Sequence, residues 1–187
     1  MSRDEGELIR RAKNGDARAF SEIYDEHQPA IYRYICCRVG NDAVAEDLTS
    51  EVFVKLVEKI DTYTYRGRPL LAWLYTIARN LVNDHHRQRG RADVVGLDES
   101  LPGDFDDPEQ AADRVLDRER LAQALEELTE DQRQVIILRF FEELDNRTVA
   151  QVLDKSYGAV KALQHRGLEA LRRALGEQRR WTADDGR

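Results

Sequence analysis

This chain of 187 residues has few of the features that mark secreted, membrane-spanning or disulfide-linked proteins. Its two cysteines, Cys36 and Cys37, are adjacent, and since neighbouring cysteines rarely form a structural disulfide we expect two reduced thiols. The longest apolar run, residues 70–75, has six residues, whereas a membrane span needs about 20. The first residues contain no apolar stretch of the signal-peptide kind. We therefore expect a cytoplasmic protein with no direct membrane insertion.

The charged residues are plentiful but unevenly distributed. Hydrophobic residues make up 41% and charged residues 35%, a composition typical of a folded protein, and the length suits one domain or two small ones. The net charge is −7, yet residues 92–113 alone carry eight acidic side chains and no Lys or Arg. Segments 66–91 and 155–180 each have a net charge of +5. Two basic segments indicate a polyanion contacted at two places, although solvated helix faces explain the charges equally well.

Helical periodicity runs through nearly the whole chain and predicts an all-α protein. We expect two small helical domains, residues 1–90 and 114–178. Residues 91–113, rich in acidic residues and containing glycines and prolines, read as a flexible acidic linker between them. Thr129 to Gln132 has the form of a capping box, two shorter helices are expected at 147–153 and 157–175, and the tail from residue 181 is expected to be loose.

Local signals predict where the helices of the first domain begin and end. Asp16 can cap a helix that Pro29 should kink or split and that ends at Gly40. Asp42 can cap the next helix, in which Val57 widens the apolar stripe. A third helix is expected to start with Pro69 as its first residue and to run to about residue 88.

Residues 146–168 have the spacing of a helix-turn-helix. This motif needs a small residue where its helices cross, a turn residue that tolerates a left-handed backbone and a branched apolar anchor, and Ala150, Asp154 and Val160 stand at these places. Ser156 can cap the second helix, whose exposed residues would then meet the major groove of DNA. An ordinary helical hairpin with a charged outer face remains the alternative.

A second face of the helix at 69–88 carries groups suited to unpaired bases. Trp73, Thr76, Asn80, Asn83 and Arg87 adjoin the apolar stripe, and Tyr63, Tyr65 and Arg66 precede the helix. An aromatic ring can stack on a base, amides can bond base edges and a cation can pair with phosphate. Packing at the rim of the core is the alternative for these residues.

Three motifs together resemble the bacterial sigma factors of the extracytoplasmic-function (ECF) group, part of the sigma-70 family. They are residues 45–53 (AEDLTSEVF), 66–80 (RGRPLLAWLYTIARN) and 156–161 (SYGAVK), in the right order and at the right separations. The resemblance covers nearly the whole chain. It implies a transcription initiation factor that binds core RNA polymerase, directs it to promoters and helps to open the DNA. It also implies an anti-sigma factor as a further partner.

The resemblance assigns roles residue by residue. It implies that polymerase docking uses Asp47, Leu48, Glu51 and Phe53. It implies that the minus-ten element, as melted strand, meets Tyr63, Tyr65, Arg66, Trp73, Asn80, Asn83 and Arg87. It implies that the minus-thirty-five element, as duplex, meets Arg147, Thr148, Ser156, Tyr157, Gly158, Ala159, Lys161, Ala162, His165 and Arg166. Asp154 and Ala159 depart from the family's usual glycine and threonine, so promoter sequence cannot be carried over.

Two other functions compete with this interpretation. An autonomous helix-turn-helix regulator that binds duplex DNA without polymerase would explain the second domain but not Trp73 and the tyrosines before it. An enzyme would have to use His27, Asp84, His85 or His86, but adjacent histidines on a helix point about 100° apart and no helical HxxxH pair or phosphate-binding glycine loop is present. We therefore expect no catalytic residues, metal, cofactor or small-molecule substrate.

Overall fold

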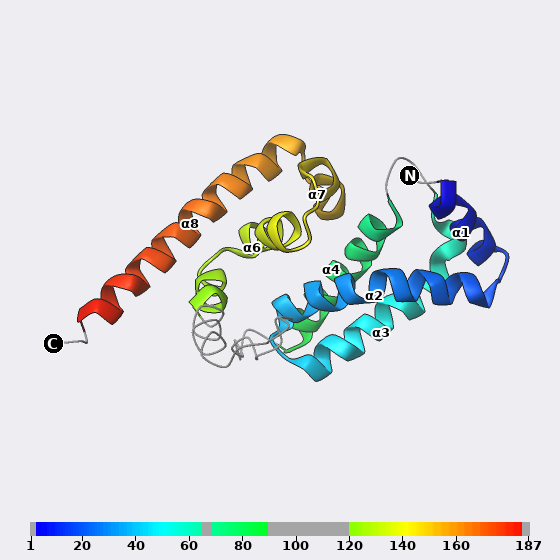
Figure 1. Cartoon of the computed structure of the whole chain (residues 1–187), viewed down its shortest axis with the longest axis horizontal. Helices are drawn as coiled ribbons and strands as arrows, with labels where there is room; N and C mark the ends of the chain where they lie inside the picture. Colours follow the sequence, from blue (N-terminus) through cyan, green and yellow to red (C-terminus); the bar gives the residue numbers. More distant parts are fainter. Residues whose placement is uncertain (1–2, 65–68, 90–119, 185–187) are drawn as a thin grey trace, which may run out of the picture. The chain divides into compact units, whose positions relative to one another are not determined.

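The computed structural model describes residues 3–64, 69–89 and 120–184, and all the regular structure in these ranges is helical (Figure 1). The prediction of an all-α protein is confirmed. The described residues fall into two compact units, which are treated separately below. The whole of the predicted acidic linker, residues 91–113, lies outside the described residues, as does the predicted start of the second domain at residue 114.

The N-terminal unit is built around three long helices. α2 (Ala17–Val39), α3 (Asp42–Lys59) and α4 (Leu70–Arg89) pack on one another, and in Figure 1 α2 and α3 run side by side. α1 (Arg3–Lys13) packs on α2 and on the 3-10 turn η1 (Ile60–Thr62). The largest fully buried side chains are two tyrosines, Tyr34 and Tyr75, whose rings meet edge to face with centroids 5.2 Å apart. Such a pair adds to the apolar burial that holds the three helices together.

Two of the predicted helix boundaries are corrected by one residue. Asp16 caps α2 as predicted and accepts a hydrogen bond from the backbone N–H of Arg18. Asn41 rather than Asp42 caps α3, because left-handed Gly40 ends α2 and leaves Asn41 extended, with its side chain accepting from the N–H of Val44. Pro69 lies immediately before α4 instead of being its first residue, and its carbonyl accepts from the N–H of Ala72.

Pro29 was predicted to kink or split its helix; the split is wrong, since α2 continues through this residue, and the kink stays a prediction. A proline within a helix removes the hydrogen bond to the carbonyl four residues earlier. Here that carbonyl belongs to Asp25, and both Asp25 and Pro29 are exposed. Water can therefore take the place of the lost donor.

The C-terminal unit consists of residues 120–126, which are helical, α6 (Glu130–Ile136), the π-helical turn η2 (Ile137–Phe141), α7 (Asn146–Leu153) and α8 (Tyr157–Asp184). The predicted capping box at Thr129 and Gln132 is confirmed, with each side chain bonding the other residue's backbone N–H. α6 packs on α8 where Gly167 lets Ile136 approach; a Cβ at Gly167 would lie 3.0 Å from Ile136 Cγ1.

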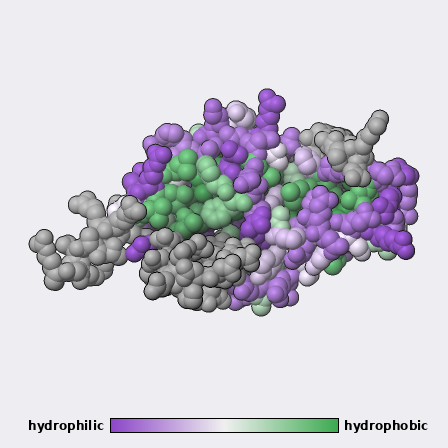
Figure 2. All heavy atoms as spheres, viewed as in Figure 1, coloured by the Kyte–Doolittle hydropathy of each residue, from purple (hydrophilic) through white to green (hydrophobic). Residues whose placement is uncertain are grey.

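α8 is longer than predicted and includes residues 181–184, which the sequence suggested would be loose. Its last ten residues contain no proline and several good helix formers, so nothing stops the helix at 175. Among the described residues, no helix is both long and apolar enough to cross a membrane. Hydrophilic residues cover most of the face seen in Figure 2, and hydrophobic ones reach it in patches.

Candidate functional site

The outer side of α3 combines exposed carboxylates with an apolar border. Asp47 and Glu51 are exposed, and Glu51 lies 3.4 Å from the ammonium group of Lys55. Leu48 is only 8% exposed and belongs to the buried stripe that continues at Val52. The docking role that the family resemblance implies for Leu48 therefore stays a prediction, since little of its side chain is exposed.

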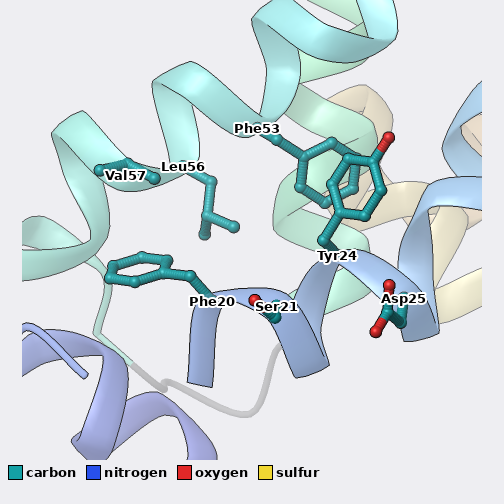
Figure 3. A pocket seen from close by; sticks show the side chains of 7 residues that line it. All are labelled: Phe20, Ser21, Tyr24, Asp25, Phe53, Leu56 and Val57. Carbon is teal, nitrogen blue, oxygen red and sulfur yellow. The ribbon is translucent and has the colours of Figure 1, made fainter. Parts of the chain in front are cut away.

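Phe53 lines an open groove between α2 and α3, with a volume of about 270 Å³ (Figure 3). Phe20 and Tyr24 of α2 point toward Leu56 and Phe53 of α3, and the rings of Tyr24 and Phe53 have centroids 4.7 Å apart. The groove is lined by Phe20, Ser21, Tyr24, Asp25, Phe53, Leu56 and Val57. This lining is apolar and aromatic apart from Ser21 and Asp25, as in a site that takes up an apolar group of a partner.

The rim of this groove exposes apolar side chains, among them one that the sequence assigned to the buried stripe. Val57, expected to widen the buried stripe, is 55% exposed, and Tyr24 is 43% exposed. Val54, also on α3, is 54% exposed. Periodicity could not find the groove, because Phe20 and Tyr24 follow the same helical stripe as the buried residues of α2. Apolar side chains exposed together, unlike single ones, mark an interaction surface.

The tyrosine that follows η1 is packed rather than free. Tyr63 is buried, and its ring lies against that of Trp73 with centroids 5.0 Å apart and planes at 43°. Trp73 is half-buried and keeps part of its ring accessible. Of the predicted pair, Trp73 is therefore the ring that can meet a base and Tyr63 the one that supports it. Tyr65 and Arg66 lie outside the described residues.

Further along α4, the predicted side chains differ in what they offer. Asn80 is exposed, and Arg87 is exposed and paired with Asp84 at 2.6 Å. Asn83 is half-buried, and its Oδ1 accepts from Arg38 Nη2 at 2.9 Å. The structure thus brings Trp73, Asn80 and Arg87 to the surface of one helix, while the Asn83 side chain is bonded to Arg38 of α2.

Arg38, which no sequence pattern singled out, is buried near the end of α2. Besides Asn83, it bonds the hydroxyl oxygen of Tyr34 through Nη1 at 2.9 Å, and its guanidinium lies 5.6 Å from the Tyr34 ring centroid. A cation among the buried residues Ile35 to Val39 was the available signal. The two contacts with Tyr34 hold the guanidinium in place, and its hydrogen bond to Asn83 then orients the Asn83 amide from the core side of α4.

The helix-turn-helix has the predicted turn geometry. Asp154 is left-handed at φ 53° and ψ 46°, and the N–H of Lys155 donates to the carbonyl of Ala150 at 3.0 Å. Ser156 Oγ accepts from the N–H of Ala159 at 3.1 Å, and Val160 is buried as the expected anchor. Asp154 can fill the place of a turn glycine because aspartate adopts this region more readily than most residues.

A cap that was not predicted starts α7. The carboxylate of Asp145 accepts from the N–H groups of Thr148 and Arg147, at 2.9 and 2.7 Å. These hydrogen bonds hold the pKa of Asp145 below its ordinary value, because they favour the charged form. The cap fixes the N-terminal end of α7. Arg147 is exposed at this end, and Thr148 beside it is half-buried.

The predicted recognition face of α8 is presented to solvent. The residues exposed on or just before this helix are Ser156, Tyr157, Gly158, Lys161, Ala162, His165 and Arg166, and Ala159 is half-buried. Lys161 Nζ lies 5.9 Å from the Tyr157 ring centroid, and His165 Nδ1 lies 3.5 Å from Glu169. Further exposed cations continue along the helix at Arg172 and Arg173. This face can bind duplex phosphates and base edges.

The residues of the competing enzyme interpretation lie on two helices, His27 on α2 and Asp84, His85 and His86 on α4. His27 is buried with no hydrogen-bond partner for Nε2 among the described residues, and burial lowers its pKa. Cys36 and Cys37 are buried free thiols, and Cys36 Sγ donates to Asp42. Within ranges 3–64, 69–89 and 120–184, no cluster of three His, Cys, Asp or Glu could hold a metal ion.

Comparison with known proteins connects both surfaces to one family. Residues 23–92 match the model of sigma-70 region 2, and residues 118–171 match that of sigma-70 region 4. The ECF RNA polymerase sigma factor BldN of Streptomyces coelicolor is 40% identical over 176 residues, which cover 93% of this chain and 67% of BldN.

Two solved structures share the fold. CnrH, solved with the cytosolic domain of CnrY, has a TM-score of 0.72 at 24% identity over 92% of this chain and 97% of CnrH. The sigma factor RpoE of Bartonella quintana, solved with the anti-sigma factor NepR, has a TM-score of 0.69 at 24% identity over 86% of this chain and 98% of RpoE. At this identity the likeness extends to the fold alone.

Proposed function

Because the chain belongs to the ECF group of sigma-70 factors, which bind core RNA polymerase and start transcription at promoters, we propose how its surfaces divide this work. The α2–α3 groove and the carboxylates of α3 dock on core polymerase. The outer face of α4 receives melted minus-ten DNA, and α8 reads the minus-thirty-five duplex. The observation that carries this division is that one unit exposes an aromatic and amide face while the other exposes a cationic recognition helix.

Docking rests on the groove between α2 and α3. Its aromatic floor is open, its rim exposes Tyr24 and Val57, and Asp47 and Glu51 are exposed on α3. An apolar anchor surrounded by charge suits a partner surface that offers both hydrophobic and basic side chains. Phe53 contributes from within the groove, and Leu48, which is buried to the same extent, keeps the docking role that the family resemblance implies.

Recognition of the melted strand rests on Trp73 and Asn80. A half-buried indole supported by Tyr63 can stack on an unpaired base, and the exposed amide of Asn80 can bond a base edge. Arg87 is exposed for phosphate, and Arg38 holds the Asn83 amide in one orientation. Tyr65 and Arg66 retain the role that the family resemblance implies for them.

Recognition of the upstream duplex rests on the start of α8. Ser156, Tyr157, Lys161 and Arg166 are exposed near its first turns, and Gly158 leaves open space, since a Cβ there would meet nothing within 4 Å. Arg147 and Thr148 lie at the capped start of α7, where they can contact the DNA backbone.

The same proposal extends to partner and place. An anti-sigma factor, such as the one that accompanies RpoE of Bartonella quintana, would cover these surfaces and keep the protein from polymerase. The protein would act in the cytoplasm, beside core polymerase, with no catalytic residue, cofactor or small-molecule substrate of its own.

Transcription from a library of genomic fragments tests the proposal. Core polymerase is incubated with the library with and without this protein, and the transcripts are sequenced. We expect a set of start sites that appears only with the protein and shares two upstream elements. If the protein adds no start sites, or if the added sites share no upstream element, the proposed function is wrong.

A further inference from the structure

α1 lies outside the residues that match sigma-70 region 2, yet it contacts the part of the chain that leads to Trp73. The family match begins at residue 23, whereas α1 ends at Lys13. The helix packs on α2 and on η1, the turn just before Tyr63. Its side chains reach partners about fifty to sixty-five positions away in sequence, which only the folded chain brings near.

The first such side chain is Lys13, at the end of α1. Its Nζ donates to the carbonyl oxygen of Tyr63 at 2.6 Å and to that of Asp61 at 3.3 Å. Both carbonyls belong to the segment in which η1 ends. The ring of Tyr63 is the one that packs on Trp73, so Lys13 holds the backbone from which the supporting ring projects.

The second is Glu5, near the start of α1. Its Oε1 accepts a hydrogen bond, 2.7 Å long, from the N–H of Leu70, which is the first residue of α4. This N–H has no partner within its own helix, and a carboxylate at a helix N-terminus also complements the helix dipole. The N–H of Trp73 bonds the carbonyl of Pro69 in this same first turn, so Glu5 fixes the turn that carries Trp73.

We propose that Glu5 and Lys13 are positioning residues for promoter recognition, which hold Trp73 and Tyr63 in the arrangement that receives an unpaired base. This inference rests on the proposed function of α4. Lys13 fixes the backbone at Tyr63 and Glu5 fixes it at Leu70, three residues before Trp73, so the two rings meet the DNA already ordered. Ordering a side chain in advance removes part of the cost of binding. A purely structural α1 would affect the amount of folded protein but not the selectivity of α4.

The fluorescence of Trp73 tests the positioning without polymerase. Trp181 is the chain's second tryptophan, so the Trp181→Phe protein reports on Trp73 alone. We expect Lys13→Met and Glu5→Ala to increase acrylamide quenching of Trp73, while Lys13→Arg and Glu5→Gln, which retain a donor and an acceptor, leave it near the parent value. The matched control is Glu7→Gln with Arg10→Met, which removes an exposed ion pair of α1 that is 2.5 Å long.

Selectivity at the minus-ten element is the second measurement. Open complexes are counted on a promoter taken from the library experiment and on versions of it in which the non-template minus-ten bases are replaced. The ratio of the first count to the second measures selectivity and does not depend on the fraction of the protein that is active. We expect Lys13→Met and Glu5→Ala each to lower this ratio about two- to tenfold, the range that one hydrogen bond is worth. The conservative and control variants should keep the parent ratio.

The outcomes separate the inference from the function on which it rests. If Trp73→Ala leaves the ratio unchanged, the proposed role of α4 fails, and this inference fails with it. If Trp73→Ala lowers the ratio while Lys13→Met and Glu5→Ala match the control in both measurements, only the positioning role is overturned. Equal quenching in the conservative and the disruptive variants would overturn it as well.

Discussion

Replacing Val57 with aspartate should uncouple the protein from core polymerase while leaving it folded. Val57 lines the α2–α3 groove and is 55% exposed, so an additional partner is needed to bury it. Burial of a whole valine side chain is worth about 1.5–3 kcal/mol, so covering the exposed half contributes about 1 kcal/mol to docking. A carboxylate at this position would lose that contribution and would also have to be desolvated.

These two effects together predict a dissociation constant for core polymerase that is about tenfold higher or more, since 1.4 kcal/mol is a factor of ten. Folding stability should change by no more than about 0.5 kcal/mol, as for other exposed positions. The dissociation constant is measured by titrating labelled protein with core polymerase, and stability by thermal unfolding. Phe53→Ala is a poorer test because Phe53 is nearly buried, so its truncation would also weaken the packing of α3 on α2.

Lys59→Gln is the matched control for Val57→Asp. It lies on the same helix, is exposed, is not part of the groove lining and makes the protein more acidic by the same single charge. We expect its affinity to stay within about twofold of the parent value, as for an exposed charge. The docking assignment is refuted if Val57→Asp binds as tightly as the parent, or if Lys59→Gln weakens binding as much as Val57→Asp does.

Three further predictions concern DNA, pH and packing. Lys161→Ala should weaken upstream binding and lower its salt slope by about one, whereas Trp73→Ala should impair opening and be rescued only by a pre-melted template; equal rescue of both contradicts the division of surfaces. Burial lowers the pKa of His27, although nearby carboxylates oppose this shift. Below about pH 6.5 the unfolded state therefore binds more protons than the folded state, and the free energy of unfolding should fall as the pH falls. In thermal unfolding measured at several pH values, His27→Leu should make the melting temperature less dependent on pH. Gly167→Ala should destabilise the C-terminal unit by about 1 kcal/mol, because the added methyl group would press on Ile136 of α6. Gly176→Ala has open space around it and should stabilise the unit by about 0.5–1 kcal/mol. If denaturant unfolding gives the same stability change for both variants, Gly167 does not make a close contact with α6.

Local features of the fold could be predicted because their physics is contained in a few neighbouring residues. Asp16 and Thr129 cap helices as expected, and Asp154 with Ser156 forms the turn and cap of the helix-turn-helix. Even the error at Asp42 is a shift of one residue, since Asn41 is also a good cap. In each case the partner lies within four positions of the residue that determines the structure.

The features that could not be predicted depend on residues distant in sequence. The groove requires Phe53 and Tyr24 to meet across two helices, and periodicity assigns both to apolar stripes without saying which edge stays open. Arg38 reaches Asn83 across 45 positions, and Glu5 reaches Leu70 across 65. A polar residue among apolar neighbours shows that a partner must exist but does not identify it.

Dependence on core polymerase tests the central claim most directly. The free chain has only modest positive charge on each DNA-facing segment, and its α4 face acts on bases that have already left the duplex, so the chain alone has little with which to select a promoter. Mobility-shift titrations at physiological salt should compare a promoter fragment with a scrambled one, with and without core polymerase. We expect the free chain to bind both weakly and equally, and the complex with core polymerase to prefer the promoter. Tight, sequence-specific binding by the free chain would contradict this account and would favour an autonomous regulator.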